Sequence, residues 1–204
     1  MPRKNLIRSS QFPYHVTARA NNQKWFQLPM NDVWKICLDC LKEANDRHCV
    51  DVFAFVLMSN HYHLIVRTPN SNLDQFMYEF NKRLAFKLKD TTNNINHLLG
   101  GRYKWCLIQT ERYFSHCLRY VYQNPRRAMI VENCQNYPYS TFHYIKNNKK
   151  FIVPIVSQDE SESKDFLNWI NEQIADDERE LIQNGLRRSE LKSLKMRSKR
   201  RSFF

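Results

Sequence analysis

The sequence lacks any apolar run that approaches the length of a membrane span. Its first residues, Met1 to Asn5, contain no apolar segment of the kind found in secretory signals. The C-x-x-C pair Cys37 and Cys40 has no second C-x-x-C elsewhere, which excludes a four-cysteine zinc site. Both cysteines fall on the apolar face of a predicted helix, where they are expected to be small buried side chains. We therefore expect a cytoplasmic protein with reduced cysteines and no membrane partner.

Acidic residues are also comparatively few, and the charge balance is strongly basic. The 204 residues include 32 Lys and Arg against 20 Asp and Glu, which gives a net charge of +12. A balance of this kind indicates a polyanionic partner, and nucleic acid is the first candidate. Hydrophobic residues make up 42% of the chain, enough to build a core. The length fits one domain of ordinary size with an appendage.

Hydrophobic periodicity predicts four strands and three helices in the first two thirds of the chain. The predicted order is strand 12–20, helix 29–48, strand 50–58, strand 61–67, helix 72–89, strand 102–109 and helix 111–123. The first six of these elements form a βαββαβ pattern, which is the ferredoxin-like arrangement of the α+β class. It predicts an antiparallel four-stranded sheet with two helices on one face and the third strand in a central position. The seventh element is an additional helix that bears tyrosines.

The chain divides into a predicted domain, residues 1–150, and a charged extension, residues 151–204. The extension is expected to contain a docked helix and to end in a basic tail from residue 187 onwards.

A histidine pair on the third predicted strand is the first candidate for chemistry. Side chains on a strand alternate between faces, so His61 and His63 lie on one side while Tyr62 and Leu64 lie on the other. Two imidazoles on one rigid face can hold a divalent cation. Single histidines are more often structural, and that role is expected for His15, His48, His97, His116 and His143.

The last predicted helix offers a third ligand and a nucleophile. Tyr120 and Asn124 are four residues apart, so both project from one helical face. If this helix crosses the sheet near the histidines, Asn124 supplies an oxygen ligand and Tyr120 reaches a bound substrate. Gln123, three residues after Tyr120, is the rival ligand. Mixed nitrogen and oxygen ligation suits Mg²⁺ or Mn²⁺ at least as well as a closed zinc site.

Four ordered motifs resemble those of REP-associated tyrosine transposases, which belong to the single-tyrosine transposase family of bacterial insertion sequences. The second motif is similar to the His-hydrophobic-His pattern of the HUH single-strand DNA nucleases. The motifs are Tyr14-His15-Val16-Thr17-x-Arg19, Met58-x-Asn60-His61-x-His63, Arg102-Tyr103-Lys104 and Tyr120-Val121-x-x-Asn124-Pro125-x-Arg127-Ala128. The resemblance spans about residues 12–140, with Ser59 where proline is common and Tyr62 in place of an aliphatic residue.

The resemblance implies a metal-dependent enzyme that cleaves and transfers single-stranded or hairpin DNA. In such an enzyme His61, His63 and Asn124 hold a Mg²⁺ or Mn²⁺ ion that polarises the scissile phosphate. Tyr120 attacks phosphorus, which releases a 3′-hydroxyl and leaves a 5′-phosphotyrosine bond. Some relatives exchange the tyrosine helix between two subunits, whereas REP-associated members are thought to act alone, so monomer and homodimer both stay open.

Basic residues beside these motifs are candidates for the DNA backbone. They are Arg19, Arg67, Arg102, Lys104, Arg126 and Arg127. Tyr103 and Trp105 are candidates for stacking on unpaired bases, although one of the two is expected to face the core. Tyr113 and Tyr122 are rival nucleophiles, although packing on the helix is the expected role of both.

Two other functions fit the same pattern. The first is a noncatalytic nucleic-acid binder, because RNA-recognition domains share the βαββαβ topology. The aromatic-rich RNP signature of those domains is absent, and the chain contains only 3 glycines. The second is a domesticated relative that nicks or binds DNA without mobilising an element.

Overall fold

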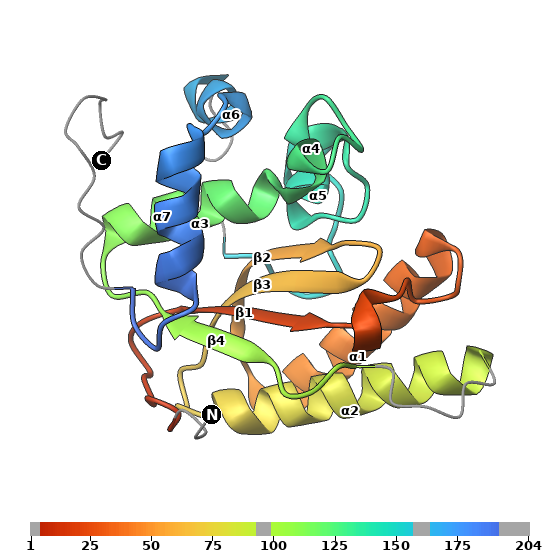
Figure 1. Ribbon diagram of the computed structural model, residues 1–204. Coiled ribbons are helices and arrows are strands. Elements are labelled where there is room, and N and C mark those ends of the chain that lie inside the picture. The colour runs from red at the N-terminus through yellow and green to blue at the C-terminus, as the bar shows by residue number, and fades with distance from the viewer. Residues whose placement is uncertain (1–4, 93–98, 157–163, 192–204) are drawn as a thin grey trace.

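The computed structural model describes residues 5–92, 99–156 and 164–191. A four-stranded antiparallel sheet lies at its centre, with the strand order β2-β3-β1-β4 (Figure 1). The strands are β1 (Tyr14–Arg19), β2 (Asp51–Leu57), β3 (His61–Arg67) and β4 (Lys104–Leu107). The α+β class and the ferredoxin-like arrangement predicted from the sequence are confirmed.

The histidine strand β3 lies inside the sheet, between β2 and β1. The β2–β3 hairpin turns at Ser59 and Asn60, and its last hydrogen bond runs from the Met58 amide to the His61 carbonyl at 2.7 Å. On the other side β1 pairs with β3 so that Thr17 lies opposite His63. Because β3 is paired along both edges, its backbone is restrained, and this fixes the positions from which the histidine side chains project.

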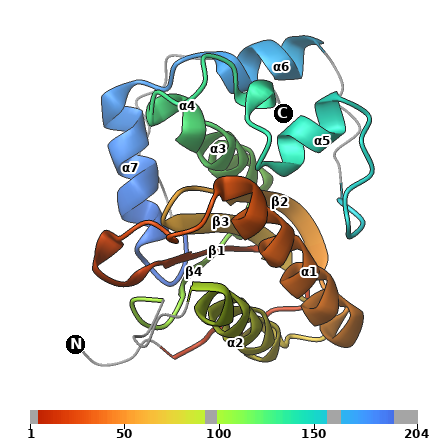
Figure 2. The same ribbon diagram turned by 90° about the vertical axis from the view of Figure 1, so that its right-hand side faces the viewer.

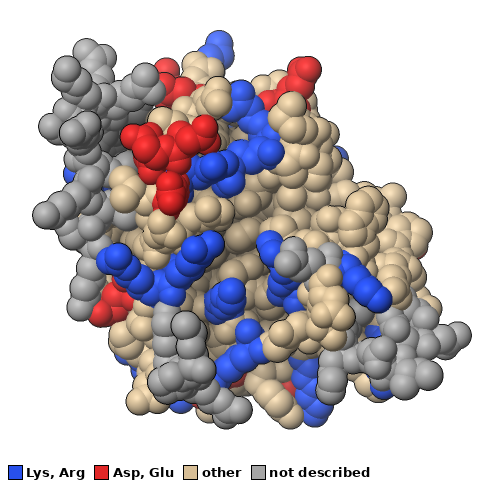
Figure 3. All heavy atoms as spheres, viewed as in Figure 1, with Lys and Arg blue, Asp and Glu red and all other residues tan. Residues whose placement is uncertain are grey.

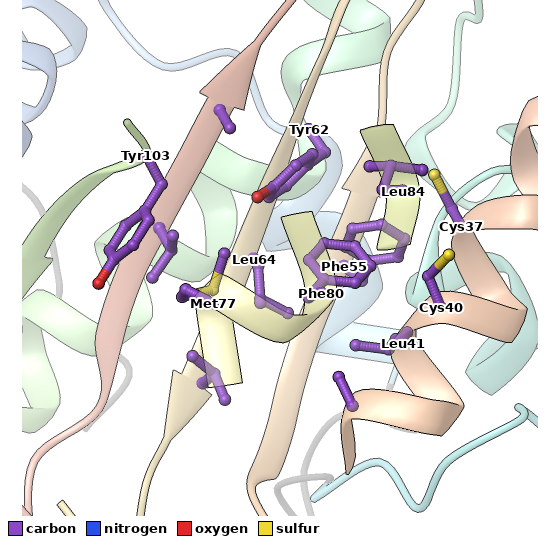
Figure 4. Close-up of a cluster of buried hydrophobic side chains, with 14 of the residues drawn as sticks. Cys37, Cys40, Leu41, Phe55, Tyr62, Leu64, Met77, Phe80, Leu84 and Tyr103 are labelled. Carbon is purple, nitrogen blue, oxygen red and sulfur yellow. The ribbon is translucent and has the colours of Figure 1, made fainter. Parts of the chain in front are cut away.

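Two long helices, α1 (Met30–His48) and α2 (Leu73–Thr92), cover one face of the sheet (Figure 1). Alternate residues of the strands point into this layer and pack there with the apolar sides of both helices. Residues of the cluster that Figure 4 labels include Cys37, Cys40, Leu41, Phe55, Tyr62, Leu64, Met77, Phe80, Leu84 and Tyr103. Cys37 and Cys40 are buried free thiols, as predicted.

A third helix, α3 (Glu111–Tyr122), covers the opposite face of the sheet (Figure 2). Thr110 caps its first turn, since the Thr110 side chain accepts a hydrogen bond from the amide of Tyr113. After Gln123 the chain continues as the short helix α4 (Asn124–Arg127), whose first turn contains Pro125. Buried residues of α3 pack on β2, β3 and β4 and form a second apolar cluster.

The remaining elements surround α3 and the ends of the sheet. They are η1 (Asn21–Gln23), η2 (Cys134–Asn136), α5 (Thr141–Lys146), α6 (Lys164–Asn171) and α7 (Asp176–Leu186). The extension therefore contains two helices within the described residues, where the sequence predicted one. Both lie against the α3 layer (Figure 2).

After α7 the chain returns to the sheet beside β4. The Leu107 amide donates to the Ser189 carbonyl at 2.9 Å, and the Leu191 amide donates to the Leu107 carbonyl at 2.9 Å. The rest of the predicted basic tail, residues 192–204, lies outside the described residues. Among the helices in the described ranges, none has the length and hydropathy needed to cross a membrane.

Candidate active site

His61 and His63 project from β3 towards α3, on the face opposite the α1–α2 core. Their rings lie edge to face with centroids 5.1 Å apart. His63 is buried, whereas His61 is half-buried at the end of the strand. Tyr62, between them, points the other way into the core, where its hydroxyl donates to Asn81 Oδ1 at 2.6 Å. The placement of both histidines on one face agrees with the alternation of the strand.

Each histidine has its Nδ1 atom engaged by a neighbouring polar side chain. Asn60 Oδ1 lies 2.7 Å from His61 Nδ1, and an amide oxygen can only accept, so His61 Nδ1 carries the proton. His15 Nε2 lies 2.9 Å from His63 Nδ1. In both rings Nε2 is the nitrogen that remains for another ligand. Asn60 and His15 therefore both contact the histidine pair, and the structural role expected for His15 includes a hydrogen bond to His63.

Burial keeps these imidazoles neutral. Removal from water lowers the pKa of His15 to about 4, and it does the same for His61, with a further contribution from the positive charge of Arg19. The pKa of His63 is lowered well below its ordinary value by burial and by His15, His61 and two arginines, Arg19 and Arg127. Near neutral pH the rings carry no charge, so their lone pairs are available.

Tyr120 lies on the face of α3 that meets the histidines. Its ring is edge-on to His63, with centroids 5.9 Å apart, and edge-on to His15 at 6.4 Å. The two rival tyrosines lie elsewhere: Tyr122 is buried beside Thr141, with hydroxyl oxygens 3.2 Å apart, and Tyr113 packs at the edge of the α3 apolar cluster. Of the three tyrosines, Tyr120 is the one whose ring meets the histidine pair.

The two candidates for a third ligand point in different directions. Asn124 follows Tyr120 by one turn, and its Nδ2 donates to the Tyr120 carbonyl at 2.9 Å and to the Val121 carbonyl at 3.2 Å. These bonds occupy the amide nitrogen and leave Oδ1 as the atom for a ligand. Gln123 instead donates from Nε2 to the carbonyls of Ile170 and Glu172, at 2.7 and 2.6 Å. Gln123 holds the end of α6, so the structure does not support it as a ligand.

Arg126 and Arg127 are neighbours in sequence with different surroundings. Arg126 donates from NH1 to the Asn171 carbonyl at 2.5 Å and so fastens α4 to the end of α6. Arg127 lies over the Tyr120 ring, with its guanidinium carbon 5.4 Å from the ring centroid. The Nε and NH1 atoms of Arg127 are buried without a hydrogen-bond partner. The DNA-binding role predicted for Arg126 is not supported, whereas Arg127 lies beside the candidate nucleophile.

The other predicted DNA contacts are distributed along the sheet. Arg19 lies opposite His61 and is exposed, and Lys104 lies opposite Thr17 on the same face. Arg102 is exposed just before β4. Arg67 ends β3 at the far end from His61, where its NH2 atom pairs with Asp51 Oδ2 at 2.7 Å. The prediction for Arg67 is therefore not supported by its position.

The predicted base-stacking residues Tyr103 and Trp105 are both buried in the α1–α2 core. Tyr103 directly precedes β4 and lies on the same side of the sheet as Trp105, two residues later. Neither side chain can receive a base in this arrangement.

Basic side chains gather on the face of the molecule where the sheet edge and α3 are both in view. Figure 3 shows Lys and Arg side chains around a hollow on this face, with Asp and Glu side chains mainly towards the top. A surface of this sign attracts a polyanion. The exposed residue Arg19 and the half-buried Arg127 add positive charge where the histidines and Tyr120 meet.

Comparisons with known proteins give a family for the sequence and a solved structure with the same fold. The sequence matches the family described as "Transposase IS200 like" over residues 8–124, a span that includes both histidines, Tyr120 and Asn124. A REP-associated tyrosine transposase bound to a REP hairpin has the same fold, with a TM-score of 0.62 and 15% identity over 80% of this chain and 98% of that chain. A protein from Deinococcus radiodurans R1 assigned as a transposase has a TM-score of 0.40 and 16% identity over 59% of this chain and 94% of that chain. No curated protein matches the chain.

Proposed function

Because this chain belongs to the IS200-like transposase family, we propose that it cleaves and rejoins DNA through a covalent bond to Tyr120. The observation that carries the proposal is the position of the Tyr120 ring, 5.9 Å from the ring of His63 in the same chain. The phenol oxygen attacks phosphorus and loses its proton, while the bond from phosphorus to the 3′ oxygen breaks. The products are a 3′-hydroxyl, which takes up a proton, and a 5′-phosphotyrosine that conserves the energy for rejoining.

The side chains around Tyr120 fit a divalent cation. His61 and His63 are neutral and have Nε2 free, because their Nδ1 atoms face Asn60 and His15. Asn124 adds Oδ1, since its nitrogen is bonded to its own helix. Two imidazole nitrogens and one amide oxygen give the mixed ligation that suits Mg²⁺ or Mn²⁺. When bound, Mg²⁺ or Mn²⁺ would polarise the scissile phosphate and offset its developing charge.

Arg127 supplies positive charge beside Tyr120 that does not depend on a bound cation. A half-buried guanidinium with unpaired Nε and NH1 atoms is costly to maintain, because burial removes water without supplying a carboxylate. A scissile phosphate beside the Tyr120 ring would give this charge a partner. We assign Arg127 to the scissile phosphate and Arg19, on the neighbouring strand opposite His61, to the adjacent DNA backbone.

The substrate is proposed to be hairpin or single-stranded DNA. The solved REP-associated transposase that shares this fold is bound to a REP hairpin. Exposed Arg102 and Lys104 at the start of β4 extend the basic surface along the sheet edge and are assigned to the backbone of such a hairpin. The Tyr120 ring meets the His63 ring of its own chain, so the tyrosine is proposed to act in the chain that carries it.

The test is incubation of the protein with end-labelled hairpin DNA and Mn²⁺, followed by a denaturing gel. Wild-type protein is expected to give a tyrosine-linked species, and Tyr120→Phe is expected to give none while it binds the hairpin with unchanged affinity. Tyr122→Phe is the matched control on the same helix, because the Tyr122 hydroxyl faces Thr141 instead of the histidines. An adduct of undiminished yield in Tyr120→Phe would place the nucleophile elsewhere, and cleavage that persists in EDTA would refute the cation.

A further inference from the structure

His15 is a buried polar side chain of the site that is neither a proposed cation ligand nor the proposed nucleophile. It lies on β1, two residues before Thr17, and Thr17 is the register partner of His63. Residues two apart on a strand share a face, so His15 lies diagonally across from His63 on the side that faces α3. Its ring stacks on that of His63 with centroids 5.2 Å apart and an interplanar angle of 23°. Only 3% of its surface is exposed.

Packing alone does not account for an imidazole in this place. On the same face His15 lies opposite Ile65 of β3 and Cys106 of β4, both buried apolar neighbours. An apolar side chain would fill the space without the cost of burying a polar ring. Among the described residues, the His15 side chain makes one hydrogen bond, and that bond joins its Nε2 to His63 Nδ1. The position of that single bond indicates what the ring does.

We propose that His15 is a positioning residue that accepts a hydrogen bond from His63 Nδ1 and thereby presents His63 Nε2 to a divalent cation. A neutral imidazole carries one proton on its two nitrogens. If His63 keeps its proton on Nδ1, Nε2 has the lone pair that a metal needs, and His15 must then carry its own proton on Nδ1. The inference rests on the proposed cation site.

Asn60 and His61 show the same arrangement at the other histidine. Asn60 Oδ1 accepts from His61 Nδ1, so His61 also turns Nε2 outwards. The two ligands are therefore held by different acceptors, an amide oxygen at the exposed end of β3 and an imidazole nitrogen in its buried interior. Outer partners of this kind orient metal-binding histidines, and their loss typically weakens metal affinity by about 10–100-fold.

The test compares two variants of His15 that differ by one methylene group. The amide of Gln can place an acceptor near the position of Nε2, whereas the shorter amide of Asn ends near the position of Nδ1. We expect His15→Gln to bind Mn²⁺ within about threefold of the wild-type affinity, and His15→Asn to bind it about 10–100-fold more weakly. Affinity is measured on the full chain without DNA, from the electron paramagnetic resonance signal of free Mn²⁺. Circular dichroism establishes that each variant is folded.

A second readout distinguishes positioning from ligation. Electron spin echo modulation of bound Mn²⁺ is expected to show two coordinated imidazoles in the wild type and two in His15→Gln. A third imidazole that disappears in His15→Gln would make His15 a ligand and overturn the inference. Equal Mn²⁺ affinity of wild type and His15→Asn would also overturn the positioning role of His15. That result would leave the proposed Tyr120 adduct untouched. If the wild type binds no Mn²⁺, the inference falls together with the proposed cation, whereas an absent adduct with intact Mn²⁺ binding counts against the Tyr120 mechanism alone.

Discussion

The two faces of the sheet have different compositions although the same strands build both. Towards α1 and α2 the strands present Tyr62, Leu64 and their neighbours, which pack in an apolar cluster (Figure 4). Towards α3 the same strand presents His61 and His63. The α1–α2 face contains most of the large buried side chains. The α3 face also buries polar imidazole rings, and removing these rings from water costs free energy. The proposed chemistry is thus confined to the α3 face, whereas both faces carry apolar clusters that stabilise the fold.

The division has a simple physical origin in the two-residue repeat of a β-strand. His63 and Leu64 are neighbours in the chain, yet their side chains point to opposite faces of the sheet. The polar rings are restrained by a strand that is anchored by the apolar residues between them. Substitutions at neighbouring positions should therefore separate the loss of chemistry from the loss of folding.

The largest effect is expected from the adjacent pair His63→Ala and Leu64→Ala. His63→Ala removes a proposed ligand, so the cleavage rate in Mn²⁺ should fall at least about 100-fold, to the level of wild-type protein in EDTA. Leu64→Ala opens a cavity in the α1–α2 core and should lower the free energy of unfolding by about 2–5 kcal/mol. The cleavage rate per folded molecule should stay within about twofold of wild type in Leu64→Ala. Equal loss of cleavage in both variants would remove the distinction between the faces.

The next effect is expected from Arg127→Gln and Arg126→Gln. Arg127→Gln removes the unpaired charge beside Tyr120 and should slow cleavage by about 10–100-fold. Arg126→Gln removes the bond to the Asn171 carbonyl and should lower the free energy of unfolding by about 1–2 kcal/mol with cleavage near wild type. Single-turnover cleavage and urea denaturation measure the two quantities. Slower cleavage in Arg126→Gln with near wild-type cleavage in Arg127→Gln would show that Arg126, and not Arg127, contacts the phosphate.

The buried histidines predict a pH dependence of stability. The pKa values of His15 and His61 are about 4 in the folded protein and about 6.5 when unfolded, so the unfolded chain binds more protons between these limits. The free energy of unfolding should therefore fall as the pH decreases from about 6.5 towards about 4. Urea denaturation in metal-free buffer between pH 7 and pH 5, where most carboxylates stay ionised, measures the slope. His15→Gln should have a shallower slope, and an identical slope would mean that His15 is not responsible.

The smallest effect is expected from Arg67→Gln, with Arg19→Gln as the matched change of charge. Arg67 pairs with Asp51 at the far end of β3, so its loss should cost less than about 1 kcal/mol and leave hairpin affinity within about twofold. Arg19→Gln should weaken binding and reduce the dependence of log affinity on log salt by about 0.7–0.9, the value for one phosphate contact. Fluorescence anisotropy at several salt concentrations gives both quantities. If Arg67→Gln also lowers the salt dependence of hairpin affinity, the DNA contacts must extend to the end of β3 that bears Arg67.

Local patterns predicted most of the fold because they are read within one element. The bounds of β3 agree with the prediction at both ends, and α1 and α2 begin within one residue of their predicted starts. The two faces of β3 follow from alternation alone, which correctly placed His61 and His63 together. The spacing of Tyr120 and Asn124 predicts that both lie on one side of the tyrosine helix; in the structure Asn124 begins α4, and its side chain bonds back to the Tyr120 carbonyl.

Local patterns did not reveal the contacts between elements that are distant in sequence. His15 is 48 residues from His63, and no local pattern reveals that their rings meet. Gln123 and Arg126 are bonded to backbone carbonyls at the end of α6, a segment that joins them only after the extension has folded against α3. Their side chains have the chemistry expected of a ligand and a DNA contact, but the position of α6 decides what they bind.

The sequence by itself determined the α+β class, the faces of each strand and the set of residues able to hold a cation or attack phosphorus, since these depend on repeats of two and 3.6 residues. The tertiary structure decided which members of that set meet. It brought Tyr120 to His63, set Arg127 over the Tyr120 ring and directed Gln123 away, because the placement of α3 depends on packing against β2, β3 and the extension. Such packing is a sum over contacts that no single stretch of the chain contains.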